Sequence, residues 1–317
     1  MNTPPPTGNG VLSPLPELSA SDEWPQGLRI GPLVGLVAMV ALATVAIAVA
    51  MKGVRQDEFS AVVVAMGLLV LSCCGLVGLM SMAGFRFLGL SNRITADGTG
   101  VRIPMRRYLL VLLIGLGLVA AMALVTAIGW SFGLDSTASF LNPDDVGEAR
   151  FLLICGGISL AAFVFFLAFR APTVLIVSRA GIRRTTRRYR GPVVKTFDVF
   201  LPWDDIVEFI PDEQIVGGLI EVRNPIIRIR STSTRTKAEQ LAFDTDDRVT
   251  VLAHLLVAEP NTLLALLQFL KDNPDRRDIL ERPDARELLR PPALRDRFRA
   301  ARSVKSSGPR RALRSGS

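Results

Sequence analysis

Four long apolar runs dominate the first half of the chain. They occupy residues 31–51, 61–83, 108–130 and 151–169, and none of them contains a charged side chain. A helix rises about 1.5 Å per residue, so helices of this length reach about 30 Å and match the hydrocarbon core of a bilayer. The pattern therefore predicts a multi-pass α-helical membrane protein with four transmembrane helices, whose membrane region spans 29–169.

Charge in the connections predicts how these helices are oriented. The loop at 84–107 carries five arginines against the single acid Asp97, whereas the connection between the third and fourth runs is acidic. Lys and Arg near helix ends stay on the cytoplasmic side. We therefore expect the basic loop and both chain termini to face the cytoplasm, at the cell membrane. The segment 1–28 is rich in Pro, Gly and Ser, which is typical of a disordered cytoplasmic leader.

The periodicity changes after the fourth apolar run. Short β-branched stretches separated by Gly or Pro predict antiparallel strands. The predicted strands are 173–178, 182–190, 193–201, 206–211, 219–223, 226–231 and 240–244. Asn224 and Pro225 are predicted to form a turn between two of these strands. The segment 250–258 fits either a short helix or a last strand.

A leucine-rich amphipathic helix is predicted over residues 261–271. Asn261 can cap its start and Pro274 ends it. Four leucines fall on one face and would cover the sheet: Leu263, Leu266, Leu267 and Leu270. We expect a cytoplasmic domain over 171–290, with closing helices, followed by a basic disordered tail at 291–317.

Three stretches of this domain carry a resemblance: TVLIVSRAGIRRTT, LPWDDIVEF and NTLLALLQFLKDNPDRRDIL. They resemble the bacterial pleckstrin-homology-like (PH-like) domains of actinobacterial membrane proteins. The matching residues are Gly181, Ile182, Pro202, Trp203, Asp204, Asp205, Ile206 and the run 263–270. The resemblance implies a PH-like β domain, a curled antiparallel sheet closed by a C-terminal helix. Such domains bind phosphoinositides in some proteins and peptides in others, so the ligand stays open.

A weaker similarity links two segments of the chain itself. Residues 94–103 (ITADGTGVRI) echo residues 176–184 (IVSRAGIRR), and each segment follows a pair of apolar runs. Both a degenerate internal repeat and chance are consistent with this similarity.

The chain is strongly basic, with a formal net charge of +8. Such an excess predicts an acidic partner, although cations also fix membrane topology. The densest cluster follows the fourth run, where it would face the anionic inner leaflet. The candidate lipid- or anion-binding residues are Arg183, Arg184, Arg187, Arg188, Arg190 and Lys195.

No pattern typical of catalysis, metal binding or cofactor binding is present. His254 is the sole histidine and lies in an apolar stretch, and the three cysteines lie inside apolar runs. Asp204 and Asp205 fit a turn that leads into a strand, with Trp203 in the core. The apolar runs contain no Asp, Glu, Lys, Arg or His, which disfavours a transporter. The basic tail has a single aromatic residue, Phe298, and so lacks the interleaved aromatics that stack on bases, which disfavours nucleic acid.

The sequence thus predicts a non-enzymatic, membrane-anchored binding or scaffold protein without metal or cofactor. Its cytoplasmic domain would engage the anionic inner leaflet, a membrane protein partner or a second copy of the chain. The alternative is an accessory subunit of a transporter or envelope complex.

Overall fold

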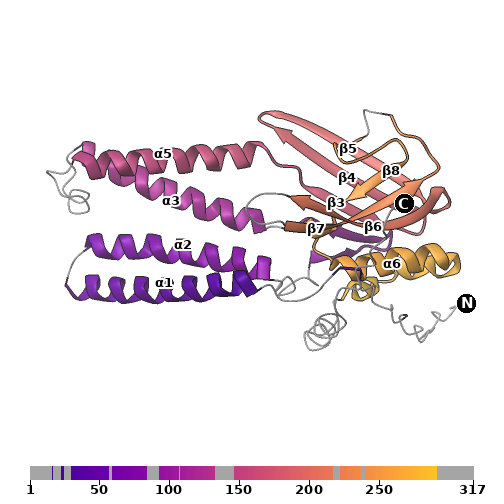
Figure 1. Cartoon of the computed structure of the whole chain (residues 1–317), viewed down its shortest axis with the longest axis horizontal. Helices are drawn as coiled ribbons and strands as arrows, with labels where there is room; N and C mark the ends of the chain where they lie inside the picture. The colour runs from indigo at the N-terminus through magenta and orange to yellow at the C-terminus, as the bar shows by residue number, and fades with distance from the viewer. Residues whose placement is uncertain are drawn as a thin grey trace, which may run out of the picture.

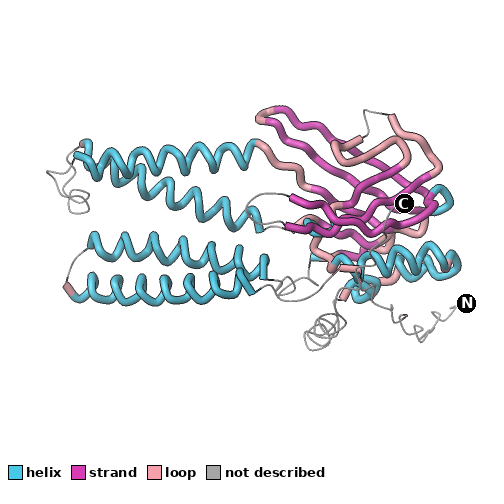
Figure 2. Tube along the Cα trace, viewed as in Figure 1, coloured by secondary structure: helices cyan, strands magenta, loops and turns pink. Residues whose placement is uncertain are grey.

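The molecule is elongated, with long helices at one end and a domain of strands at the other (Figure 1 and Figure 2). The computed structural model describes residues 16, 23–24, 30–56, 59–83, 93–106, 108–132, 146–216, 222–236 and 240–290. We call the strand-rich end, together with the helix α6, the sheet domain.

The long helices are α1 (Ile30–Arg55), α2 (Phe59–Ala83), α3 (Tyr108–Ser131) and α5 (Val146–Ala168). The first three cover the predicted apolar runs and α5 ends one residue short of the fourth, so the predicted helix positions are confirmed. α1 lies along α2, and α3 lies along α5 (Figure 1). Glycines allow this close packing, because a Cβ added to Gly35 would lie 3.1 Å from Leu79 and one added to Gly117 would lie 3.2 Å from Phe163.

The prediction of four membrane spans is contradicted. Among the described residues, only Pro32–Arg55 in α1 is long and apolar enough to cross a membrane. Shorter apolar helical stretches are found among the described residues at Ala65–Met80, Leu113–Val125 and Gly156–Ala168. The described part of the chain therefore does not support a multi-pass protein. The stretch in α1 could serve as a membrane anchor or as a signal sequence.

Two antiparallel sheets form the sheet domain, in the strand orders β1-β2-β3-β4-β5 and β6-β7-β8. The first sheet contains β1 (Thr95–Ala96), β2 (Val101–Pro104), β3 (Thr173–Val177), β4 (Gly181–Arg190) and β5 (Val193–Pro202). The second contains β6 (Ile206–Val216), β7 (Val222–Ser231) and β8 (Arg248–Val251). β-Branched residues recur in most of these strands, as expected for a pleated surface that is buried on one face.

The hairpin β1–β2 joins the first sheet although it precedes α3 in the chain. Val101 pairs with Val177 and Ile103 with Leu175, and all four side chains are fully buried. This corrects two expectations, namely that 84–107 is only a basic loop and that the domain begins at 171. The described part of that loop supplies an edge of the domain. The two segments with similar sequences thus lie side by side as neighbouring strands.

Two predicted elements near β7 are wrong. The predicted turn at Asn224-Pro225 lies inside β7, where Pro225 pairs with Glu213 of β6. β8 pairs only with Ile227–Arg230, so Pro225 lies outside the stretch of β7 that has strands on both sides, where a missing N–H is tolerated. The predicted strand at 240–244 is a turn-rich loop instead.

The helix α6 (Pro260–Asp272) packs on the sheets and closes the core. The predicted leucine face is confirmed, because Leu263, Leu266, Leu267 and Leu270 are fully buried. Glu259, rather than Asn261, is the N-cap, and its carboxylate accepts a 2.6 Å hydrogen bond from the N–H of Thr262. The 3₁₀ helices are η2 (Trp203–Asp205), η3 (Ala253–Leu255), η4 (Pro274–Glu281) and η5 (Ala285–Leu289).

Close approach of two strands makes Gly181 a sensitive position. A Cβ added there would lie 2.2 Å from the carbonyl oxygen of Leu201 in β5. We therefore expect Gly181→Ala to push β4 and β5 apart and to lower the free energy of unfolding by about 1–3 kcal/mol. Thermal unfolding of the detergent-purified protein measures this. Gly157→Ala in α5 is the control, because nothing lies within 4 Å of the added Cβ. Equal melting of Gly181→Ala and wild type would contradict the expectation.

Candidate anion-binding surface

The hairpin β4–β5 extends past the core towards the end of α5. Its strands pair from Gly181↔Pro202 to Arg190↔Val193, and Gly191 makes the turn with a φ of +60°, which favours glycine. The outer half of β4 also bonds to the chain that leaves α5. The N–H of Tyr189 donates to the oxygen of Arg170 (2.8 Å), and the N–H of Gly191 donates to that of Ala168 (3.1 Å). These bonds hold the hairpin tip beside the helix end.

Four of the predicted cations gather near this tip. Arg187, Arg190 and Lys195 are exposed and Arg188 is half-buried. Arg188 lies directly opposite Lys195 in the register, and like charges in that position repel each other. Among the described residues, no carboxylate forms an ion pair with any of these four side chains. The arrangement leaves their charge available to an external anion.

Aromatic rings orient two of the cations at this end of the hairpin. The ammonium of Lys195 lies 4.7 Å from the ring centre of Phe197, and the guanidinium of Arg170 lies 4.7 Å from that of Tyr189. Cation–π contacts of this kind hold a charged side chain in place without neutralising it. Arg170 therefore joins the cluster, although the sequence pattern did not single it out.

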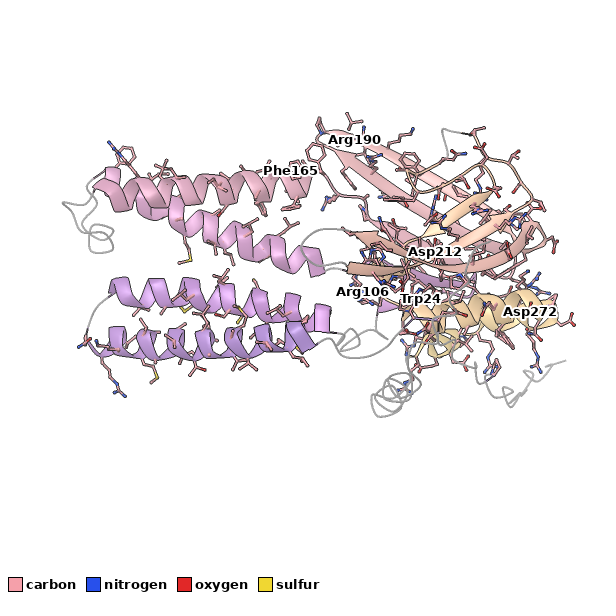
Figure 3. All side chains as sticks on the ribbon, in the orientation of Figure 1. Trp24, Arg106, Phe165, Arg190, Asp212 and Asp272 are labelled. Carbon is pink, nitrogen blue, oxygen red and sulfur yellow. The ribbon has the colours of Figure 1, made fainter. Side chains whose placement is uncertain are left out.

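Exposed apolar side chains adjoin these cations. Val193 and Val194 at the tip have exposed fractions of 64% and 51%. Phe165 and Phe169, at the end of α5, are 55% and 53% exposed, and their ring centres lie 4.8 Å apart. Figure 3 shows Phe165 and Arg190 close to the junction of the helix and the hairpin. An apolar patch bordered by cations suits the boundary between lipid headgroups and acyl chains. Sequence reasoning missed Val193 and Val194 as part of a surface, although they directly follow the Gly191-Pro192 turn.

Two of the predicted residues do not belong to this surface. Arg183 forms an exposed ion pair with Asp198, with a nitrogen–oxygen distance of 3.1 Å. Arg184 points the other way and is buried, with only 2% of its surface exposed. Neighbouring residues of a strand point to opposite faces, which separates the exposed Arg183 from the buried Arg184. We define the tip cluster by its place at the outer end of the hairpin, where cations lie on both faces: Arg170, Arg187, Arg188, Arg190 and Lys195.

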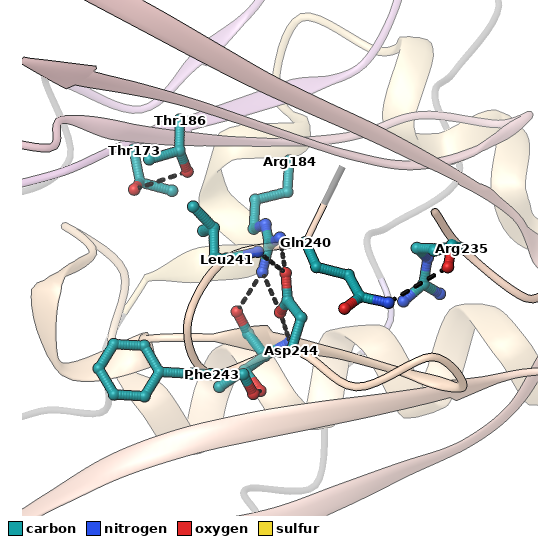
Figure 4. A network of polar contacts seen from close by, with 9 residues as sticks. Thr173, Arg184, Thr186, Arg235, Gln240, Leu241, Phe243 and Asp244 are labelled. Atoms are coloured by element: carbon teal, nitrogen blue, oxygen red, sulfur yellow. Dashed lines mark hydrogen bonds and ion pairs between the residues drawn. The ribbon is translucent and has the colours of Figure 1, made fainter. Parts of the chain in front are cut away.

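The buried Arg184 forms an ion pair with Asp244 in the loop before β8. Both oxygens of that carboxylate accept hydrogen bonds from the guanidinium, which also donates to the carbonyl oxygen of Thr250 at 2.6 Å (Figure 4). Asp244 further accepts bonds from the N–H groups of Thr250 (2.8 Å) and Leu241 (2.9 Å). The network ties β4 of the first sheet to β8 of the second. Its function is structural.

Several other polar side chains of the sheet domain have structural partners. The indole N–H of Trp203 donates to the oxygen of Ser178 at 2.9 Å, so this residue lies in the core as predicted. The Nδ1 of His254 lies 3.2 Å from the oxygen of Pro225. The hydroxyl of Thr245 lowers the pKa of Asp247. Within the described ranges, no group of His, Cys, Asp and Glu is arranged to hold a metal ion.

Comparison with protein-family models, with curated proteins and with solved structures gave no match. The PH-like family suggested by the sequence motifs therefore stays a prediction.

Removal of Arg184 should destabilise the protein far more than removal of its neighbour. Arg184→Met leaves the Asp244 carboxylate buried without its cation, which costs about 3–5 kcal/mol. Arg183→Met breaks only the exposed pair with Asp198 and should cost about 1 kcal/mol or less. Chemical unfolding of the two variants measures the difference. Similar loss of stability in both would contradict the structural assignment.

Proposed function

We propose that the chain is a non-enzymatic, membrane-anchored binding protein whose sheet domain engages an anionic membrane surface through the tip cluster. The single observation that carries this proposal is the meeting of unpaired cations with exposed apolar side chains at the β4–β5 tip. Each cation near an anionic leaflet contributes about 1 kcal/mol. Burial of Val193 and Val194 in the headgroup region would add to that attraction.

The apolar helix α1 supports the anchoring part of the proposal. Pro32–Arg55 is strongly apolar, and little of it is buried inside the protein. Val34, Val37 and Val54 are each at least 65% exposed. An exposed apolar surface of this extent marks a site of contact with a membrane or a protein, and a bilayer would bury it. The basic character of the chain favours the cytoplasmic side of the cell membrane.

The shape of the sheet domain supports its use as a binding module. Two antiparallel sheets closed by α6 agree with the PH-like scaffold that the motifs suggest. In this proposal the tip cluster meets lipid, while the remaining faces are available to a protein partner. An accessory role in a transporter or envelope complex is the alternative, and it predicts no response of the tip to lipid charge.

A fluorescent reporter at the tip tests the proposal in the full-length protein. Val194→Cys, in a chain whose native cysteines are replaced by alanine, is labelled with an environment-sensitive dye and placed in nanodiscs. We expect a blue shift of the emission with anionic lipid, and a smaller one with neutral lipid. Added salt should reverse the shift, because it screens exposed charges.

Variants of the tip cluster sharpen this test. Replacing Arg187 and Arg190 together by Gln removes about 2 kcal/mol of attraction, which corresponds to about a thirtyfold weaker association. Arg179→Gln is the matched control, because this exposed arginine lies in the turn at the opposite end of β4. An emission that is the same in neutral and anionic nanodiscs would refute the lipid proposal and favour the accessory role.

A further inference from the structure

Trp24 is buried in the sheet domain, although it precedes all the helices in the chain. It is 5% exposed and belongs to the same core cluster as β2, β3 and α6. Figure 3 shows it at the end of the domain that faces the long helices. The segment 1–28 was expected to be a disordered leader. At Trp24 this expectation is corrected.

Trp24 forms three hydrogen bonds with the sheet domain, two through its backbone and one through its indole N–H. Its N–H donates to the Oδ1 of Asn261 at 3.1 Å, and its carbonyl oxygen accepts from the Nδ2 of Asn261 at 2.9 Å. One amide side chain thereby satisfies both backbone groups of a single residue, as a neighbouring strand would. The indole N–H donates to the backbone oxygen of Asp212 in β6 at 3.2 Å.

Asn261 is placed for this contact and not for capping. It lies in the first turn of α6 and is fully buried, while Glu259 satisfies the helix start. With Trp24 withdrawn, the amide of Asn261 would lose the two hydrogen bonds that it makes to Trp24. A buried polar group left without partners is costly. The side chain thus forms a site that takes the N–H and the carbonyl oxygen of one peptide residue.

We propose that the surface formed by Asn261, the backbone oxygen of Asp212 and the adjoining core is a peptide-binding site for a segment that contains tryptophan. Its resident ligand is the chain's own segment around Trp24. Because Trp24 lies shortly before α1, its binding attaches the chain just ahead of that helix to the sheet domain. This proposal does not depend on lipid binding by the tip cluster.

A covalently attached ligand competes strongly with a free one, because its effective concentration is in the millimolar range. The test therefore uses full-length Trp24→Ala protein in detergent and a labelled peptide with the sequence of residues 21–26, SDEWPQ. Fluorescence anisotropy measures binding. We expect the variant to bind this peptide at least tenfold more tightly than SDEAPQ, and at least tenfold more tightly than the wild-type chain does.

A second substitution ties the binding to the proposed contact. Asn261→Ala in the Trp24→Ala chain should weaken peptide binding at least tenfold. Asn273→Ala is the matched control, because this residue bonds to Phe269 at the other end of α6. Should Trp24→Ala lose cooperative unfolding, Trp24→Phe keeps a ring in the pocket and carries the same comparison. Equal binding of the two peptides to a folded variant would overturn the proposal, as would equal binding of SDEWPQ to variant and wild type.

Discussion

The pairing of β2 with β3 is the contact on which the rest of the structure depends. β2 lies between α2 and α3 in the chain, and β3 follows α5, so this ladder holds the helices and the sheet domain together. The chain at the end of β2 also bonds to the segment before α6. The N–H of Val257 donates to the oxygen of Pro104 at 3.0 Å, and the N–H of Arg106 donates to the oxygen of Leu255 at 2.8 Å. Without β2, Leu175 and Val177 would lose one of the two strands that pair with them, and β3 would become an exposed edge.

The position of an arginine along β4 decides whether its charge is neutralised inside the fold or is exposed. Arg184 and Arg188 lie on the same face of β4, yet Arg184 is inside the domain, where Asp244 neutralises it, and Arg188 lies past the core beside Lys195. A buried cation requires a partner, whereas an exposed one can stay unpaired at little cost. The distance of each arginine from the core therefore decides whether it stabilises the fold or is available to bind an anion.

Several parts of the fold were predictable because their signals are local. Apolar runs gave the positions of the long helices, and β-branched stretches between Gly and Pro gave β3, β4 and β5. The leucine spacing gave the buried face of α6. Non-local partners caused the errors. Pro225 lies in a strand because β8 stops short of it, and residues 240–244 form a loop because Asp244 bonds to Arg184.

The sequence by itself determined where the long helices and most of the strands form and where the cations concentrate, since periodicity and composition are properties of neighbouring residues. The four-span interpretation was wrong, because among the described residues only Pro32–Arg55 is long and apolar enough to cross a membrane. Only the tertiary structure decided that β2 completes the first sheet, that Trp24 binds to Asn261, and which arginines reach the tip cluster. Each of these depends on contacts between residues far apart in the chain, and such contacts leave no period in the sequence.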